Sequence, residues 1–225
     1  GLEGEKIIDI LPIPNNKELG LGLLSSDGRF KRLPIHDILE ISGRAASIVK
    51  LKDRTVLKSA VFCHPGGDVI IGTNFGRILK LTINDVTMPM MGKLAQGAMI
   101  MRTLQEEKIV GAVARPDKNK KCYFVLANKM GILNQIDFDL IRLSKRGDLG
   151  VMAITPKELK CELDIVMDAC NSTNLISIVT SKGRVEKISQ NCYKEKNEYL
   201  INLEENEYLQ TIIPLLEEEI NTNQE

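Results

Sequence analysis

Three connecting segments of this 225-residue sequence place glycine beside a basic residue. They contain Gly43-Arg44, Gly92-Lys93 and Arg146-Gly147. Glycine lets a backbone approach a partner closely, and its N–H group together with an Arg or Lys side chain can hold phosphate oxygens. The pattern therefore predicts a repeated anion-binding position. Cations that protect exposed strand edges and keep a protein soluble would give the same pattern, so this alternative stays open.

Patterns typical of catalysis or metal binding are missing. His36 and His64 are the only histidines, and neither lies in a nucleophile or metal motif. The sequence contains no phosphate-binding loop with its Lys-Ser/Thr. The five cysteines form no Cys-x-x-Cys pair, which predicts reduced, mostly buried thiols in a cytoplasmic protein; they are Cys63, Cys122, Cys161, Cys170 and Cys192. We expect neither an active site, nor a metal site, nor a cofactor in this chain by itself.

Four copies of one turn position the basic segments. In each copy apolar residues run into a polar turn, a glycine and another short strand; the copies are Leu23–Lys31, Ile71–Leu79, Leu126–Asn134 and Ile178–Glu186. This is the pattern of a β-hairpin whose glycine has positive φ. The turn glycines lie 48, 55 and 52 residues apart, which predicts a repeat architecture.

A second element recurs with the same period. Apolar opening strands are predicted at 5–11, 54–62, 107–113, 162–167 and 207–213. Each unit then continues with a polar loop, the hairpin, an acidic segment and a fourth strand. Such units are typical of blades around an axis, so we expect an all-β, propeller-like fold. The extra strand at 207–214 should complete a blade begun elsewhere.

These repeats divide residues 1–215 into four units, followed by an acidic tail at 216–225 that we expect to be disordered. The units are approximately 5–53, 54–106, 107–160 and 161–215. All 30 Lys and Arg residues precede residue 198, whereas eight of the 30 acidic residues follow residue 197, so residues 1–197 carry a net charge of +8. A basic body with an acidic end is consistent with nucleic-acid binding regulated by the tail.

Equivalent positions in a repeat come to lie on a circle, so cations at these positions would form a belt on one rim. The candidate DNA-binding residues are Arg29, Arg44, Arg77, Lys93, Arg102, Lys145, Arg146 and Arg184. Contacts from such a belt would be mainly to phosphate, with little reading of base sequence.

The hairpin repeats, together with the phrase Met88-Pro89-Met90-Met91-Gly92-Lys93-Leu94-Ala95-Gln96-Gly97, resemble the C-terminal domain of the A subunit of bacterial type IIA topoisomerases. This family contains DNA gyrase and topoisomerase IV, and the resemblance covers essentially residues 5–215. It implies a β-pinwheel of about four four-stranded blades, open or closed. It also implies a non-catalytic domain that binds and bends duplex DNA on its basic rim and presents it for strand passage.

The resemblance further implies partners for the chain: duplex DNA, an ATPase B subunit, and the catalytic core of its own A subunit, with no membrane. The parent protein would be an ATP-dependent topoisomerase that is cytoplasmic and associated with the nucleoid. Gyrase carries the box Gln-Arg-Arg-Gly-Gly-Lys-Gly, and the nearest match here is Ser144–Gly150. Asp148 and Leu149 depart from that box, which implies weaker DNA wrapping. A propeller-like module that binds proteins and not nucleic acid is the alternative.

Overall fold

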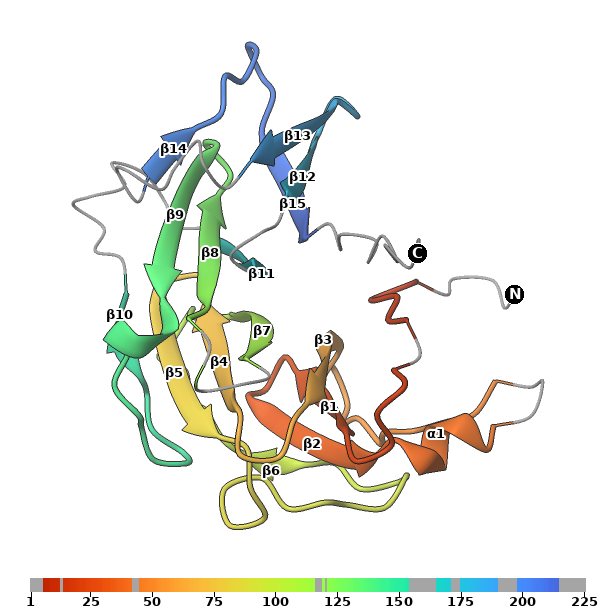
Figure 1. Ribbon diagram of the computed structural model, residues 1–225. Helices are drawn as coiled ribbons and strands as arrows, with labels where there is room; N and C mark the ends of the chain where they lie inside the picture. The colour runs from red at the N-terminus through yellow and green to blue at the C-terminus, as the bar shows by residue number, and fades with distance from the viewer. Residues whose placement is uncertain are drawn as a thin grey trace, which may run out of the picture.

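Four antiparallel sheets follow one another around a centre and form the blades of the molecule (Figure 1). The computed structural model describes residues 6–12, 14–41, 45–115, 119, 121–153, 165–170, 175–189 and 198–214. The only helical elements in these ranges are α1 (His36–Leu39) and a 3-10 turn, η1 (Phe138–Leu140). The predicted all-β, propeller-like class is therefore confirmed.

Each blade contains one of the predicted hairpins. In blades 1 to 4 respectively these are β1 (Gly20–Ser25) with β2 (Arg29–Pro34), β4 (Asp68–Thr73) with β5 (Arg77–Thr82), β8 (Tyr123–Asn128) with β9 (Ile132–Asp137), and β12 (Leu175–Thr180) with β13 (Val185–Ser189). In blades 1 to 3 the opening strand of the next unit pairs with the first strand of the hairpin; these strands are β3 (Leu57–Cys63), β7 (Ile109–Arg115) and β11 (Ile165–Cys170). In blade 4 the extra strand β15 (Leu209–Pro214) takes this place.

A short strand from the end of the next unit then pairs with the second strand of the hairpin. These outer strands are β6 (Ala98–Met99) on blade 1, β10 (Val151–Met152) on blade 2 and β14 (Glu198–Leu200) on blade 3. Blade 4 is three-stranded in the described part of the chain, in the order β13-β12-β15. Blades 1 to 3 thus each take both of their flanking strands from the following unit, so consecutive units interlock.

Two predicted strands are wrong, and both belong to the first unit. Residues 6–12 form no strand, although an opening strand was expected at 5–11, and residues 45–56 form none either, although every unit was expected to contain a fourth strand before the next opening strand. In the other units such strands pair with the hairpin of the preceding unit, and no hairpin precedes β1 in the described residues. The prediction that 207–214 joins a blade begun earlier in the chain is confirmed, because β15 pairs with β12 of blade 4. The acidic tail at 216–225 lies outside the described residues.

The core lies between successive blades. Leu24 and Phe30 of blade 1 pack against Ile71 of blade 2, and Ile178 of blade 4 packs against Leu133 of blade 3. The first hairpin strands of blades 1 and 2 are buried along their full length because a neighbour covers each of their faces. Burial on both faces explains why apolar residues run without interruption in these strands, and each buried Leu or Ile contributes roughly 1.5–3 kcal/mol.

A Thr–Glu–Arg contact joins the hairpin to the next opening strand. In blade 4 both Thr180 and Arg184 bond to the Glu207 carboxylate, and Arg184 Nη2 lies 3.1 Å from Glu207 Oε2. In blade 2 the same positions are occupied by Thr73, Arg77 and Glu107, with Thr73 Oγ1 donating to Glu107 Oε1 at 2.6 Å. The Glu204 N–H, the Thr180 hydroxyl and Arg184 lower the pKa of Glu207 to about 2.

The turn glycines of blades 1 and 4 provide a matched test of the interlock. Gly28 and Gly183 have φ values of 77° and 79°. A Cβ atom at Gly28 would lie 2.0 Å from the Met101 carbonyl oxygen of the following unit, whereas one at Gly183 would meet no described atom within 4 Å. Gly183→Ala should lower the free energy of unfolding by about 1–2 kcal/mol, the cost of left-handed backbone. Gly28→Ala should cost roughly 2 kcal/mol more, because it also displaces the segment after β6.

Urea titrations of both variants would measure this difference. Equal losses in the two variants would contradict the idea that close passage of the next unit constrains the first turn.

Glu207 should also make stability depend on pH in acid. Its folded pKa is about 2 and its unfolded pKa is near the ordinary Glu value of about 4.3, so its contribution is present above pH ~4.3 and is lost as the pH falls toward 2. Glu207→Gln should therefore destabilise the chain at neutral pH, and the gap from the parent chain should narrow as the pH falls through this window. Denaturation curves at several pH values would measure the gap. The exposed neighbour Glu205→Gln should show no such convergence.

Candidate nucleic-acid interface

The segments that lead into the outer strands lie on the periphery of the blade array (Figure 1). The opening strands β3, β7, β11 and β15 contact one another in sequence, which places them nearest the centre. The outer strands β6 and β10 lie on the opposite sides of their sheets. Segments 91–97 and 143–150, which precede β6 and β10, are therefore held at the outer edge, where a long ligand could reach several blades.

Three of the predicted residues come together at this edge, on blade 2. Arg102 Nε donates to the carbonyl oxygen of Gly147, and the Arg102 N–H donates to the Asp148 carbonyl at 3.1 Å. These bonds hold Arg102 against the turn that carries Lys145 and Arg146. All three basic side chains are exposed, and none forms an ion pair with a described residue. Arg142, exposed and directly before segment 143–150 in the sequence, adds a fourth cation that was not among the predicted residues.

We refer to Arg102, Arg142, Lys145 and Arg146 as the basic cluster. The neighbouring acid Asp148 makes a contact within its own turn, because Asp148 Oδ2 accepts a hydrogen bond from the Lys145 N–H at 3.2 Å. Asp148, one of the two residues that differ from the gyrase box, therefore caps the turn in which it lies. Four cations and one carboxylate leave the cluster positively charged, which suits it to bind an anion.

Lys93 occupies on blade 1 the position that Arg146 occupies on blade 2. Met90 forms a parallel bridge with Arg32, and Leu143 forms the equivalent bridge with Lys80. Lys93 and Arg146 lie three residues beyond these bridges. Lys31 fixes the first of the two segments, because its buried ammonium group donates to the carbonyl oxygens of Lys93 and Ile48. Burial lowers the pKa of Lys31.

The cations that follow the turn glycines have intramolecular partners. Arg29 lies 3.3 Å from Asp27 and also donates to the Gly97 carbonyl at 3.0 Å. Arg77 and Arg184 bind Glu107 and Glu207 in the contacts described above. The predicted Arg44 lies outside the described residues. The structure thus separates the predicted residues into an exposed set at the connections and a paired set at the hairpins.

The pairing also has a signal in the sequence, one that the prediction of a single cationic rim overlooked. Two hairpins carry a Thr three residues before the turn glycine and an Arg directly after it. In both cases the next opening strand is preceded by a Glu, which is Glu107 or Glu207. The first hairpin has Ser25 and Arg29 instead, and there Asp27 in the turn supplies the carboxylate. Covariation of Thr, Arg and Glu within a repeat would have indicated these contacts.

Other kinds of site are not found in the described part of the chain. No group of three or more His, Cys, Asp or Glu side chains there could hold a metal ion. Cys63 and Cys122 are buried thiols, as predicted for these two, and burial raises the pKa of Cys63 to about 12. None of the described helices is long and apolar enough to cross a membrane.

Known proteins resemble this chain in both sequence and fold. A family model described as "DNA gyrase C-terminal domain, beta-propeller" matches residues 23–56 and 67–114. The DNA gyrase A subunit of Ureaplasma parvum is 27% identical over 187 residues, covering 83% of this chain and 22% of the relative. The DNA topoisomerase 4 A subunit of Synechocystis is 30% identical over 158 residues, covering 65% of this chain and 17% of the relative. The chain thus spans about a fifth of the length of these relatives.

Solved structures agree on the fold. The structure described as that of the DNA gyrase A C-terminal domain has a TM-score of 0.72 at 17% identity, covering 89% of this chain and 67% of the other. The C-terminal domain of DNA topoisomerase IV has a TM-score of 0.73 at 14% identity, covering 95% and 67%. The resemblance noted in the sequence is confirmed: this chain is similar in sequence and in fold to the C-terminal domain of the A subunit of bacterial type IIA topoisomerases, the group that contains DNA gyrase and topoisomerase IV.

Proposed function

We propose that this chain is a non-catalytic domain that binds and bends duplex DNA for a type IIA topoisomerase. The observation that carries the proposal is the basic cluster, four exposed cations without ion-pair partners among the described residues, at the outer edge of blade 2. Lys93 repeats the position of Arg146 on blade 1. The relatives, which are A subunits of DNA gyrase and topoisomerase IV, favour the same function.

Binding would proceed through phosphate. Long Lys and Arg side chains on an exposed turn can reach the DNA backbone, whereas the described helices, α1 and η1, have only four and three residues and are too short to serve as recognition helices in a groove. Lys93 and Arg146 lie on successive blades of a curved array, so a duplex that contacts both must follow the curve. Bending DNA costs elastic energy, which the additional phosphate contacts offset.

The proposed DNA-binding set is narrower than the sequence suggested. Arg102, Lys145 and Arg146 form its centre, with Arg142 added and Lys93 as the contact on the neighbouring blade. Arg44 stays in the set on the basis of its Gly-Arg sequence. Arg29, Arg77 and Arg184 are assigned instead to holding the hairpins, because each has a carboxylate within 3.3 Å.

In this proposal the partners are duplex DNA, an ATPase B subunit, and the catalytic core of the A subunit, in the cytoplasm at the nucleoid. The chain itself needs no cofactor for phosphate binding. The zero net charge of the whole chain and the acid at position 148 favour binding that is weak at high salt.

Removal of one cluster cation should weaken DNA binding without changing base preference. Arg146→Ala should lower affinity by roughly three- to tenfold at low salt and reduce the slope of log K against log salt by about 0.9, because one phosphate contact is lost. Fluorescence anisotropy with two duplexes of unrelated sequence, across a salt series, would measure both effects.

Lys182→Ala is the matched control, because Lys182 is an exposed cation at the blade 4 turn that already binds Glu204 at 3.0 Å. Its affinity and salt slope should match those of the parent chain. No binding by the parent chain at low salt, or a loss confined to one duplex, would overturn the proposal.

A further inference from the structure

The two ends of the blade array expose the two halves of an interface that recurs inside it. Each blade has one face toward the preceding blade, which we call the N-face, and one toward the following blade, the C-face. Ile71 and Ile178 lie on N-faces, and Phe30, Ile78 and Leu133 lie on C-faces. Three hydrophobic clusters join C-face to N-face between blades 1 and 2, 2 and 3, and 3 and 4. No described cluster joins blade 4 to blade 1.

The C-face of blade 4 is left apolar and open. Val185 takes the position that Phe30, Ile78 and Leu133 take in the other blades, two residues after the turn glycine. Those three side chains are at most 2% exposed, whereas Val185 is 63% exposed. Ile213 is 45% exposed on the same face, although its counterpart Val113 is 3% exposed. This face belongs to the core in three blades, but in blade 4 no described residue covers it.

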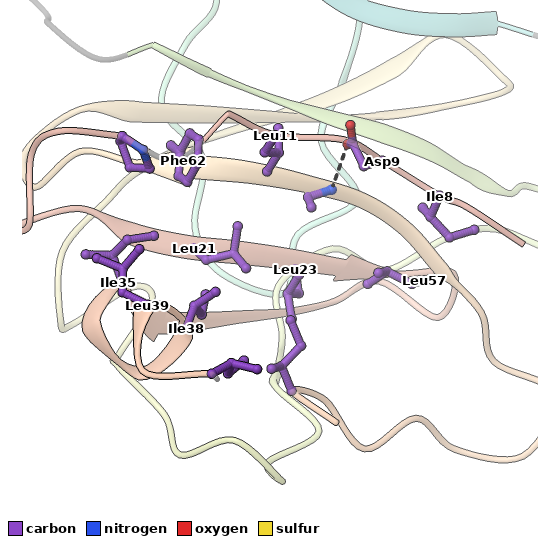
Figure 2. Close-up of a pocket in the computed structure, with 14 residues that line it drawn as sticks. Ile8, Asp9, Leu11, Leu21, Leu23, Ile35, Ile38, Leu39, Leu57 and Phe62 are labelled. Carbon is purple, nitrogen blue, oxygen red and sulfur yellow. Dashed lines mark hydrogen bonds between the residues drawn. The ribbon is translucent and has the colours of Figure 1, made fainter. Parts of the chain in front are cut away.

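The N-face of blade 1 is only partly covered. Leu21, Leu23 and Leu33 form its centre, and residues 8–12 and 14, α1 and residues 48–49 fold over part of it. A pocket of about 490 Å³ remains between these segments (Figure 2). Its lining is almost wholly apolar, and Leu39 at its edge is 39% exposed. Apolar surfaces of this kind are typical of protein contacts.

Charge at the two ends is complementary as well. Inside the array, Arg32 of blade 1 pairs with Asp85 of the next unit, and Lys80 of blade 2 donates to the Phe138 carbonyl of the next unit at 2.7 Å. Lys187 is the equivalent cation on blade 4, exposed and without a described ion pair. Asp37 is the equivalent of Asp85 in the first unit, nine residues after the turn glycine. The exposed C-face of blade 4 thus carries the cation, Lys187, and the partly covered N-face of blade 1 carries the matching acid, Asp37.

The strand pattern agrees. β13 has no outer strand among the described residues, whereas β2, β5 and β9 each have one. Ala46-Ser47 lie as far before the positive-φ residue Arg54 as strand β6 lies before the positive-φ residue Glu106. They therefore occupy in unit 1 the place that β6 occupies in unit 2. Both residues are exposed and pair with no sheet.

We propose that two copies of this chain bind head to tail, with the C-face of blade 4 of one copy seated on the N-face of blade 1 of the other. Val185 and Ile213 enter the apolar pocket, Lys187 pairs with Asp37, and Ala46-Ser47 add to the free edge of β13. A second copy fits because it presents the same two faces that already bind each other three times within the chain. The contact is heterologous, so it extends into longer assemblies or closes into a ring. It does not depend on the proposed DNA binding.

Sedimentation velocity of the 225-residue chain without DNA, over a range of concentrations, tests the proposal. The parent chain should associate as concentration rises. Val185→Glu should shift the midpoint of association by roughly tenfold or more, because it places a charge in an apolar contact. Met130→Glu is the matched control, since Met130 is 59% exposed at the blade 3 turn and belongs to neither end. Urea midpoints would verify that both variants are folded.

A charge exchange tests the head-to-tail geometry. Lys187→Glu and Asp37→Lys should each weaken self-association. An equal mixture of the two variants should regain association and extend with the variants alternating, because both kinds of contact between unlike variants join opposite charges, whereas contacts between like variants join like charges. A monomeric parent chain at all concentrations, as would follow if blade 4 closed onto blade 1 of the same chain, would overturn the proposal. Association that is indifferent to Val185→Glu, or a mixture that behaves like its separate variants, would do the same.

Discussion

Blades 1 to 3 of this protein are each incomplete without the next unit of the chain, and this interlock constrains everything else. The hairpins of blades 1 to 3 receive their inner and outer strands from the unit that follows. An outer strand must therefore pass close to the preceding turn, and the Gly28 turn has no room for a Cβ atom beside the Met101 carbonyl. The same crossing carries segments 91–97 and 143–150 to the periphery. The placement of the basic residues is thus a consequence of how the sheets are completed.

Electrostatic contacts then decide which cations remain available to a ligand. Carboxylates neutralise the Arg residues at the hairpins, and the low pKa of Glu207 reflects how well its charge is satisfied by Glu204, Thr180 and Arg184. Acids near the connections are also engaged, since Asp85 binds Arg32 and Asp148 caps the turn that carries Lys145. Excess positive charge is therefore concentrated at the connections even though the whole chain has a net charge of zero. Local charge, and not the total, is what a phosphate backbone would meet.

Much of the fold could be predicted because its signals are local and repeated. Turn glycines with polar residues before them indicate hairpins wherever they occur, and their regular spacing indicates blades. The absence of strands within 6–12 and 45–56 of the first unit arises from partners and not from propensity: in the other units such strands pair with the hairpin of the preceding unit, and no described hairpin precedes the first one. A strand requires a neighbouring edge, and a single unit of sequence does not contain that information.

The sequence by itself determined the all-β class, the four hairpins, the closing strand at β15 and a set of basic residues that includes most of the exposed cluster. Only the tertiary structure decided that strands pass between blades, that Arg77 and Arg184 bind carboxylates, and that Arg102 joins Lys145 and Arg146 at one edge. The reason is physical. Turn chemistry and apolar spacing act over a few residues, whereas pairing of strands and charges joins residues tens of positions apart, whose proximity exists only once the blades have packed.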